Sequence, residues 1–327
     1  MPELSYLEAI RSGLLAEMRD DPSVYVFGED VALGGPFGVT QGVAEELGAH
    51  RVVNTPISEG TVMGVAIGAA LSGLRPVVEI MFVDFITLAM DQLVNHAAKL
   101  HYMSGGQLKV PLTVRVQCGV QGNMGAHHSQ SLESWFLHVP GMKVVMPSNP
   151  ADAETLMRDA IRDDNPVLFV EHRGLYFTRA EVPEGGSGLA MDRAAVLREG
   201  TDVTVAAVSK MVGPSLEAAE ALAGAGVSVE VIDLRTLVPL DIGTLVESVR
   251  KTSRLVVVHE AVEQGGLGAE VAARVQEQAL YYLDSPILRV AAPNAPVPCA
   301  PPLENSFVPD KERIVAAVQR TLYIQPA

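Results

Sequence analysis

The stretch Arg51-Val-Val-Asn-Thr-Pro-Ile-Ser-Glu-Gly60 contains a short apolar strand, a proline and the start of a helix. Pro56 disfavours helical backbone at the residue before it, so the strand predicted at 51–54 must end there. Ser58 is predicted to cap a helix of mostly small residues over Gly60–Leu74. Glu59 then lies in the first turn of a nearly uncharged helix, at the junction between strand and helix.

Glu59 has two interpretations. In the simpler one its carboxylate only complements the helix dipole, which is worth under about 1 kcal/mol. In the other, the acid is buried and needs a partner such as a protonatable ring nitrogen, because an unpartnered buried charge is costly. The local pattern favours the first interpretation, and the rest of the chain reverses that preference.

Apolar runs of strand length alternate with helical patterns on both sides of this junction. Such alternation is typical of an α/β fold with a parallel sheet. In the first half of the chain, strands are predicted at 24–27, 51–54, 75–82, 112–117, 143–146 and 167–171, and helices at 5–19, 60–74, 85–103 and 150–162.

The polar stretch Pro183-Glu-Gly-Gly-Ser-Gly188 interrupts the alternation and is the best domain boundary. We therefore expect two domains, 1–185 and 201–327, joined by a linker at 186–200, each with a largely parallel sheet flanked by helices. In the second domain, strands are predicted at 203–208, 227–234, 255–259 and 287–291, and helices at 214–223, 241–252, 266–283 and 310–322.

Composition narrows the function classes. The 327 residues are 48% hydrophobic and carry a formal charge of −15, which argues against a nucleic-acid partner. Two cysteines are too few for a disulfide framework. No apolar run has the length of a spanning helix, and Met1-Pro-Glu-Leu lacks the features of a signal peptide. We expect a soluble, cytoplasmic protein with no membrane partner.

The predicted helix 60–74 carries Gly64 and Gly68, four residues apart. Glycine inside a helix costs about 1 kcal/mol relative to alanine, so the pair needs a reason. One reason is close approach of a helix from another subunit. The other is a tight fit against the chain's own sheet, and the sequence leaves both open.

Two further clusters follow Glu59. In Glu79-Ile-Met-Phe-Val-Asp-Phe85, Met81 and Phe85 are expected near the carboxyl edge of the sheet, where α/β folds bind ligands. Taken alone, the pair is more typical of a hydrophobic core.

The other cluster is Gly125-Ala-His-His-Ser-Gln130, after a glycine-rich loop. A metal site would need further ligands at defined spacing, and Ser129 lacks the Gly-x-Ser-x-Gly elbow of a hydrolase. A histidine that transfers a proton is the functional interpretation, and a solvated loop pair is the alternative. The sequence also lacks the glycine-rich motifs that cradle nucleotide phosphates.

In this order, the clusters resemble the β subunit of the thiamine-diphosphate-dependent 2-oxo acid dehydrogenase E1 component, a family with pyruvate, branched-chain and acetoin forms. The resemblance covers nearly the whole chain. The matching segments are Gly28-Glu-Asp30, Thr55-Pro-Ile-Ser-Glu59, Gly73-Leu-Arg-Pro76, Asp91-Gln92, Tyr102-Met-Ser-Gly-Gly106, His128-Ser-Gln130, Pro140-Gly-Met-Lys-Val-Val145 and Ala160-Ile-Arg-Asp-Asp-Asn-Pro166.

The resemblance implies a role for each cluster. Glu59 would hydrogen-bond N1′ of the cofactor's aminopyrimidine and favour the imino tautomer that deprotonates the thiazolium. Met81 and Phe85 would pack on the pyrimidine ring. His128 matches the family's active-site histidine, whereas His127 does not occupy that position. The implied domains are a transketolase-like pyrimidine-binding domain and a transketolase C-terminal-like domain.

A missing motif implies a partner. Enzymes of this class hold Mg²⁺ and the diphosphate with a Gly-Asp-Gly motif, which this chain lacks and which the family's α subunit carries. The resemblance therefore implies thiamine diphosphate and Mg²⁺ held jointly with α, an α2β2 heterotetramer, and acyl transfer to the lipoyl group of a dihydrolipoyl acyltransferase core (E2).

The resemblance also implies a monovalent cation site, with K⁺ as the candidate, bound largely through backbone carbonyls. The matching positions are Leu112, Ala160, Asp163 and Asn165. Gly60 and Leu88 depart from the family's usual residues and leave the substrate open. The expected function is oxidative decarboxylation of a 2-oxo acid, with an acetoin dehydrogenase β subunit and a non-catalytic scaffold for α as alternatives.

Overall fold

The computed structural model describes residues 2–323. Within it the chain divides into two compact units. Unit 1 comprises 1–118 and 135–191, and unit 2 comprises 119–134 and 192–327. The division at Met191 lies inside the predicted linker, and the domain limits 185 and 201 stay predictions.

Unit 1 is built on parallel strands in the order β6-β7-β5-β4-β2-β3. The strands are rich in β-branched residues, and in all of them except β3 most residues are buried, as expected for a sheet covered on both faces. The α/β prediction is confirmed. The strands are β2 (Val24–Gly28), β3 (Val52–Asn54), β4 (Arg75–Ile80), β5 (Thr113–Cys118), β6 (Lys143–Val145) and β7 (Val167–His172).

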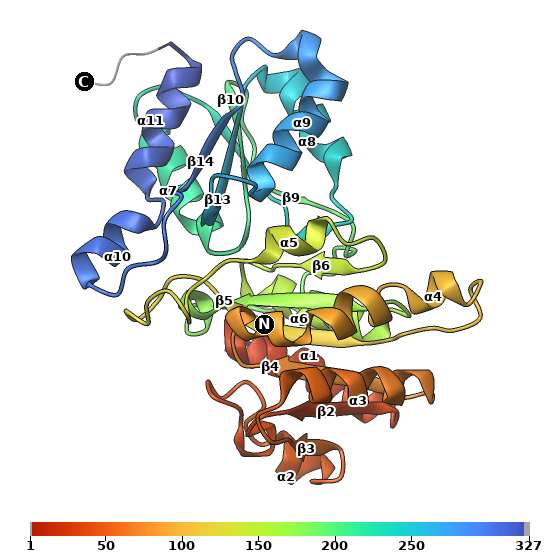
Figure 1. Cartoon of the computed structure of the whole chain (residues 1–327). Coiled ribbons are helices and arrows are strands. Elements are labelled where there is room, and N and C mark those ends of the chain that lie inside the picture. Colours follow the sequence, from red (N-terminus) through yellow and green to blue (C-terminus); the bar gives the residue numbers. More distant parts are fainter. Residues whose placement is uncertain (1, 324–327) are drawn as a thin grey trace. The chain divides into compact units, whose positions relative to one another are not determined.

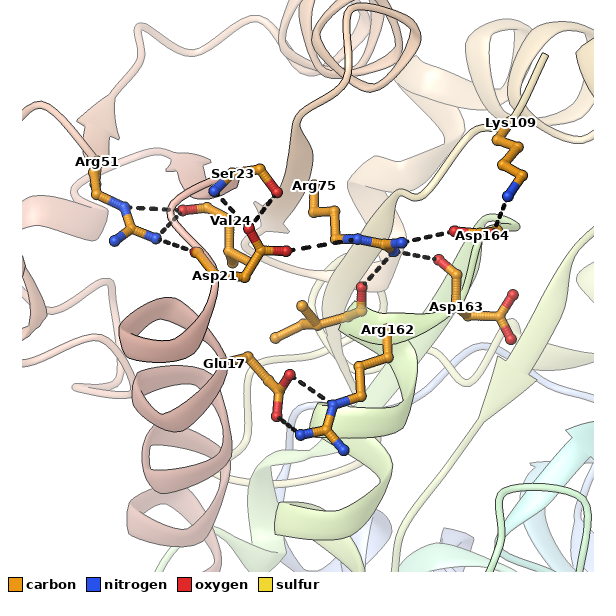
Figure 2. A network of polar contacts seen from close by, with 11 residues as sticks. Glu17, Asp21, Ser23, Val24, Arg51, Arg75, Lys109, Arg162, Asp163 and Asp164 are labelled. Atoms are coloured by element: carbon orange, nitrogen blue, oxygen red, sulfur yellow. Dashed lines mark hydrogen bonds and ion pairs between the residues drawn. The ribbon is translucent and has the colours of Figure 1, made fainter.

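Unit 1 has three long helices, α1 (Tyr6–Asp20), α3 (Glu59–Leu71) and α6 (Pro150–Arg162). Helices α1 and α6 pack against each other. A Cβ built at Gly13 would lie 2.8 Å from the Glu154 carbonyl oxygen, so only glycine permits this approach. The Glu17 carboxylate accepts hydrogen bonds from Arg158 and Arg162 of α6. Its contact with Arg162 is shown in Figure 2. The shorter elements are β1 (Glu3–Ser5), η1 (Val31–Leu33), α2 (Val43–Leu47), η4 (Arg173–Leu175) and β8 (Arg179–Glu181). Helix α5 (Glu133–Leu137) begins in unit 2 and ends in unit 1.

Two local predictions in unit 1 are wrong. The segment 85–103 is not one α-helix but a 3-10 helix η2 (Val83–Ala89), a π-helix η3 (Asp91–Ala97) and a short α4 (Leu100–Met103). Its buried residues Val83, Ile86 and Ala89 recur every three positions, the period of a 3-10 helix. Ser58 does not cap α3 with its side chain, because its hydroxyl donates to the Pro56 carbonyl oxygen at 3.3 Å.

Unit 2 contains a second sheet, in the order β14-β13-β10-β11-β9, with only β9 antiparallel. Helices α7 and α11 cover one face and α8 and α9 the other (Figure 1). The strands are β9 (Ala195–Arg198), β10 (Val203–Ala207), β11 (Val229–Asp233), β12 (Thr236–Val238), β13 (Leu255–Val262) and β14 (Leu288–Ala292). The helices are η5 (Ser209–Met211), α7 (Val212–Ala223), α8 (Ile242–Thr252), α9 (Leu267–Ala279), η6 (Leu280–Tyr282), α10 (Pro301–Phe307) and α11 (Lys311–Thr321).

Two features lie where the sequence indicated only a linker. Strand β9 was not predicted, because its four residues are all partly or largely exposed and carry no alternation of apolar and polar side chains. The polar stretch before it is hydrogen-bonded to α6, where the Ser187 amide donates to Thr155 Oγ1 at 2.7 Å and its hydroxyl to Asp152 Oδ1 at 2.6 Å. None of the helices in residues 2–323 is long and apolar enough to cross a membrane.

A buried ionic cluster lies across the three central strands of unit 1. Arg115 on β5 is 1% exposed, and its guanidinium donates to both carboxylate oxygens of Glu171 on β7, at 2.7 and 2.9 Å. It also donates to Glu79 on β4, and the Tyr176 hydroxyl donates to Glu171 at 2.7 Å. One cation thus satisfies two buried carboxylates.

Substituting Arg115 should therefore destabilise unit 1 severely. In Arg115→Met, Glu79 and Glu171 lose their cation inside the sheet, and we expect a loss of about 3–5 kcal/mol in the free energy of unfolding. Arg19→Ala is the matched control, because the Arg19–Glu46 ion pair is exposed and worth about 1 kcal/mol or less. Urea unfolding, monitored by circular dichroism, compares the two. Equal losses would contradict this account of the cluster.

Candidate functional site

Glu59 is the first residue of α3 and directly follows the turn after β3. Its side chain is buried, at 8% exposure, and among residues 2–323 no hydrogen bond or ion pair occupies its carboxylate. The turn is held by the Thr55 amide, which donates to the Gly28 carbonyl oxygen of β2 at 2.9 Å. The sequence thus places an uncompensated acid at the carboxyl edge of the sheet.

A second acid, Glu29, lies close to it. Gly28 at the end of β2 is in register with Asn54 of β3, so the residues that follow both strands meet at one edge. Burial raises the pKa of the Glu29 carboxyl, and the negative charges of Glu59 and then Asp30 raise it further. The Glu29 carboxyl is therefore more easily protonated than an exposed glutamate.

Met81 and Phe85 follow β4, which pairs with β2 on the side opposite β3. Both side chains are half-buried, whereas the intervening Phe82 is buried and belongs to the core. The Phe85 ring meets the Phe82 ring edge to face, with centroids 5.7 Å apart. Arg173 lies over the same Phe82 ring, 5.2 Å from its centroid, and fixes the support under Phe85.

Glu59, Met81 and Phe85 therefore come together at the carboxyl edge of adjacent strands, where α/β sheets bind ligands. A buried carboxylate with no other partner is suited to a ring nitrogen that shares a proton. Half-buried apolar side chains beside it are suited to the face of the same ring. This donor set fits an aminopyrimidine.

The histidine pair lies in unit 2, on the segment Gly119–Ser134, which we call the histidine segment. The Gly119 amide donates to the Gln130 carbonyl oxygen at 3.1 Å and closes the segment into a loop. His128 is half-buried, and His127 is exposed and lines a cavity of about 460 Å³. No group of three or more metal-binding side chains occurs in the described residues, so nothing there supports a metal at the pair.

The predicted cation positions lie around a basic network at one end of α6. The Arg75 guanidinium donates to the carbonyl oxygens of Ile161 and Asp163, at 3.0 and 3.1 Å (Figure 2). The Leu112 carbonyl accepts from the Val167 amide, and the Asp163 carboxylate forms an ion pair with Lys143. Two of the four predicted carbonyl ligands thus already accept hydrogen bonds, and a cation at Leu112, Ala160, Asp163 and Asn165 stays a prediction.

Helix α3 turns its glycines away from the chain's own sheet. Gly64 and Gly68 are exposed, and a Cβ built at either would meet nothing within 4 Å among the described residues. The alternative of a tight fit against the chain's own sheet is therefore wrong. Val65 on the same helix is 56% exposed, so the face is both smooth and apolar.

Sequence reasoning gave no role to two acids that the structure singles out. Glu29 appeared only within a matching segment, and its nearness to Glu59 depends on the pairing of β2 with β3. Glu133 carried no signal at all. Its carboxyl is buried in unit 2, near Glu260 on β13, and both groups come from segments far apart in the chain.

Comparison with known families identifies both parts of the chain. Residues 2–178 match the model of the transketolase pyrimidine-binding domain, and residues 192–314 match that of the transketolase C-terminal domain. Among solved structures, the chain is similar to a split-gene transketolase described as an inactive beta4 tetramer. The TM-score is 0.82 at 25% identity over 99% of both chains.

Curated relatives agree along nearly the whole length. The chain is 44% identical to pyruvate dehydrogenase E1 component subunit beta-2, mitochondrial, of Oryza sativa, over 98% of this chain and 87% of that one. It is 44% identical to the pyruvate dehydrogenase E1 subunit beta of Rhizobium meliloti, over 99% and 71%. It is 42% identical to the acetoin:2,6-dichlorophenolindophenol oxidoreductase subunit beta of Cupriavidus necator, over 98% of both.

Proposed function

The chain belongs to the family of E1 β subunits with transketolase-type domains, and from this premise we propose that it is the β subunit of a thiamine-diphosphate-dependent 2-oxo acid dehydrogenase. The observation that carries the proposal is the buried, unpaired Glu59 carboxylate beside the half-buried Phe85 at one sheet edge. A scaffold subunit would have no reason to keep an unpaired acid there, since Gln would fill the same space without the cost of a buried charge.

Thiamine diphosphate, when bound, supplies the carbanion that attacks the substrate's keto carbon. Glu59 would hold a proton at the pyrimidine N1′ position of this cofactor. Met81 and Phe85 would pack on the faces of the pyrimidine ring and exclude water.

His128 would move a proton at the acyl-transfer stage. When a lipoyl disulfide accepts the acyl group, one sulfur leaves as a thiolate and needs a proton donor. The histidine segment supplies an imidazole that is half-buried and therefore reachable by a substrate. We assign the role to His128 and none to the exposed His127.

The second half of the cofactor site would come from an α subunit, which would hold Mg²⁺ and the diphosphate. The exposed glycine face of α3 supports assembly into an α2β2 heterotetramer, because two exposed glycines let another helix approach closely. Exposed Ile57 and Leu88 extend the apolar surface near this helix. The similar split-gene transketolase is described as an inactive beta4 tetramer, which supports a β homo-oligomer when α is absent.

Pyruvate and branched-chain 2-oxo acids are the proposed substrates, with acetoin as a second candidate. The acetoin relative is nearly as similar as the pyruvate relatives, at 42% against 44% identity. Gly60 and Leu88, the two departures noted in the sequence, lie against each other, since a Cβ built at Gly60 would be 3.1 Å from the Leu88 carbonyl oxygen. We also propose that an acyltransferase core accepts the acyl group and that the protein is located in the cytoplasm.

Glu59→Gln tests the catalytic assignment. The amide keeps the shape of the side chain but cannot take up the proton, so we expect decarboxylation by the complex with α to fall by about 10²–10⁴-fold, with assembly unchanged. Glu45→Gln, an exposed glutamate on α2, is the matched control and should keep full activity. Full activity of the Glu59→Gln complex would contradict the catalytic role and favour the alternative that the chain is a non-catalytic scaffold.

His128→Ala separates acyl transfer from decarboxylation. Without the proton donor, we expect reductive acylation of a lipoyl domain to fall by about 10²-fold or more, while thiamine diphosphate binding, measured calorimetrically, is retained. His127→Ala changes the neighbouring ring and should stay within a few-fold of wild type. Normal formation of acylated lipoyl by His128→Ala would remove this assignment.

Isothermal titration of the chain alone with thiamine diphosphate and Mg²⁺ should show little binding, because the diphosphate half of the site is missing, and addition of α should restore it. Micromolar binding of thiamine diphosphate by the isolated chain would show that this chain contains the phosphate site.

A size series at Gly68 tests the assembly face. A Cβ at position 68 would meet nothing within 4 Å among the described residues. Gly68→Ala and Gly68→Leu also improve helix propensity by about 1 kcal/mol, so the isolated chain should unfold no earlier. Sedimentation should show progressive loss of the assembly with side-chain size. A Gly68→Leu chain that assembles normally with α would exclude this face as the contact.

A further inference from the structure

The histidine segment is anchored on unit 2 through Val120. Its side chain is buried in an apolar cluster with Ala292, Val297 and Phe307. Its amide donates to Glu260 Oε1 of β13 at 2.5 Å. Because a buried amide without an acceptor is costly, this bond fixes the start of the segment.

A cavity of about 380 Å³ lies beside this anchor, and every residue that lines it belongs to unit 2. Its walls come from the start of the histidine segment, from η5, α7 and α10, and from the beginning of α11. The acidic side chains that line it are Glu217, Glu304, Asp310 and Glu312, and the basic ones are Lys210 and Lys311. The lining therefore carries an excess of negative charge.

Glu304 is the buried member of these four acids, at 7% exposure, whereas the other three are exposed. Helix α10 begins at Pro301, a residue suited to the first helical position. Glu304 precedes Phe307 by three residues, so both side chains lie on one face of the helix. Phe307 packs in the apolar cluster around Val120, and the same packing turns Glu304 inward to the wall of the cavity.

The Glu304 carboxyl group has no partner within residues 2–323. Its Oε2 atom is buried without a hydrogen bond, and no ion pair joins it to either lysine of the cavity. Lys210 Nζ instead donates to the Val120 carbonyl oxygen at 3.3 Å, and Lys311 Nζ lies 3.5 Å from Glu312. A carboxylate buried without a cation is costly, so Glu304 is available to a cation from outside the chain.

We propose that this cavity is a binding site for a primary ammonium group, with the Glu304 carboxylate as its buried partner. An ammonium group offers three donors, and a bond between it and a carboxylate is among the strong hydrogen bonds of proteins. A metal ion is disfavoured, since no group of three or more metal-binding side chains occurs in the described residues. The inference goes beyond the proposed function and does not depend on it.

The remaining lining suits an alkyl chain attached to the ammonium. Pro214 and Val308 are half-buried and supply apolar wall, while Gln121 and Asn305 are exposed at the rim. Apolar wall below a polar rim fits a methylene stem with a charged end. This chemistry has two sources, a free alkyl amine and the lysine side chain of a partner protein.

Occupation of the cavity should be felt by the histidine segment. Lys210 lines the cavity and also binds the Val120 carbonyl, so a bound ammonium places a second positive charge near the group that holds the start of the segment. Val120 and Val308 both line the cavity, and their methyl groups report what enters it.

Titration of the full chain, followed by methyl NMR of labelled valines, tests the site without any variant. The probes are n-butylammonium, butanol and butyrate, which are similar in size and differ in charge. We expect n-butylammonium to shift the Val120 and Val308 signals and to bind at least about tenfold more tightly than the other two. Equal binding of butyrate, or no binding of n-butylammonium at millimolar concentrations, would overturn the inference.

Glu304→Gln tests the buried partner. The amide keeps the shape and removes the charge, so we expect the affinity for n-butylammonium to fall by about tenfold or more. Glu247→Gln, an exposed glutamate of α8 outside the lining, is the matched control with the same change in net charge and should bind as wild type. Equal affinities of the two variants would refute the assignment of Glu304.

Thermal unfolding separates a lost site from a damaged fold. A buried amide needs less compensation than a buried carboxylate, so Glu304→Gln should unfold at no lower temperature than wild type. Weaker binding together with unchanged unfolding is the expected result.

Model lysines distinguish the two sources of the ammonium group. Binding of Nα-acetyllysine methylamide as tightly as n-butylammonium would assign the site to a lysine of a partner protein. Its exclusion, with n-butylammonium still bound, would assign the site to a free amine. The same compound acetylated at Nε has no charge and should not bind, and binding of this neutral form would contradict the inference.

Discussion

Unit 1 depends on one guanidinium in the middle of its sheet. Arg115 joins β4, β5 and β7 because it binds Glu79 on one side and Glu171 on the other. Buried ion pairs add little net stability compared with apolar packing. A change in strand register that separates the pair is nevertheless costly, because it leaves a buried charge without its partner. A slip of β4 by one residue would turn Glu79 to the opposite face and leave the cation half satisfied. The cluster therefore fixes the alignment of the strands whose ends carry Met81 and Phe85.

The same cluster is electrostatically connected to the candidate site. The pKa of Glu79 is raised mainly by burial, and the charge of Glu29 contributes in the same direction. Glu29 is in turn influenced by Glu59. A row of acids thus runs from the sheet interior to its carboxyl edge, with its only compensating cation, among the described residues, at the inner end. Glu59, which influences Glu29 and makes no ion pair among the described residues, is the acid left for an external partner.

Most of the fold could be predicted from the sequence, because buried parallel strands are continuous apolar runs such as Val114 to Val116. The edge that gathers Glu59, Met81 and Phe85 was also predictable, since parallel strands end on one side. What could not be predicted depends on distant contacts. Glu133 looks like an ordinary helix-starting glutamate, and its burial reflects residues far along the chain. The prediction of one helix over 85–103 was wrong because the buried apolar residues at its start recur every three positions and favour a 3-10 helix. Helix propensity alone does not reveal this spacing.

The route of the chain has a consequence for the order of folding during synthesis. The Val120 amide and the Glu260 carboxylate that binds it are 140 residues apart. On a ribosome adding roughly 5–20 residues per second, most of unit 1 emerges many seconds before the strand that anchors the histidine segment. A nascent chain can therefore complete the edge around Glu59 while His128 still has no fixed position. Arrest or truncation before β13 would yield a product with an ordered edge around Glu59 and an unanchored histidine segment.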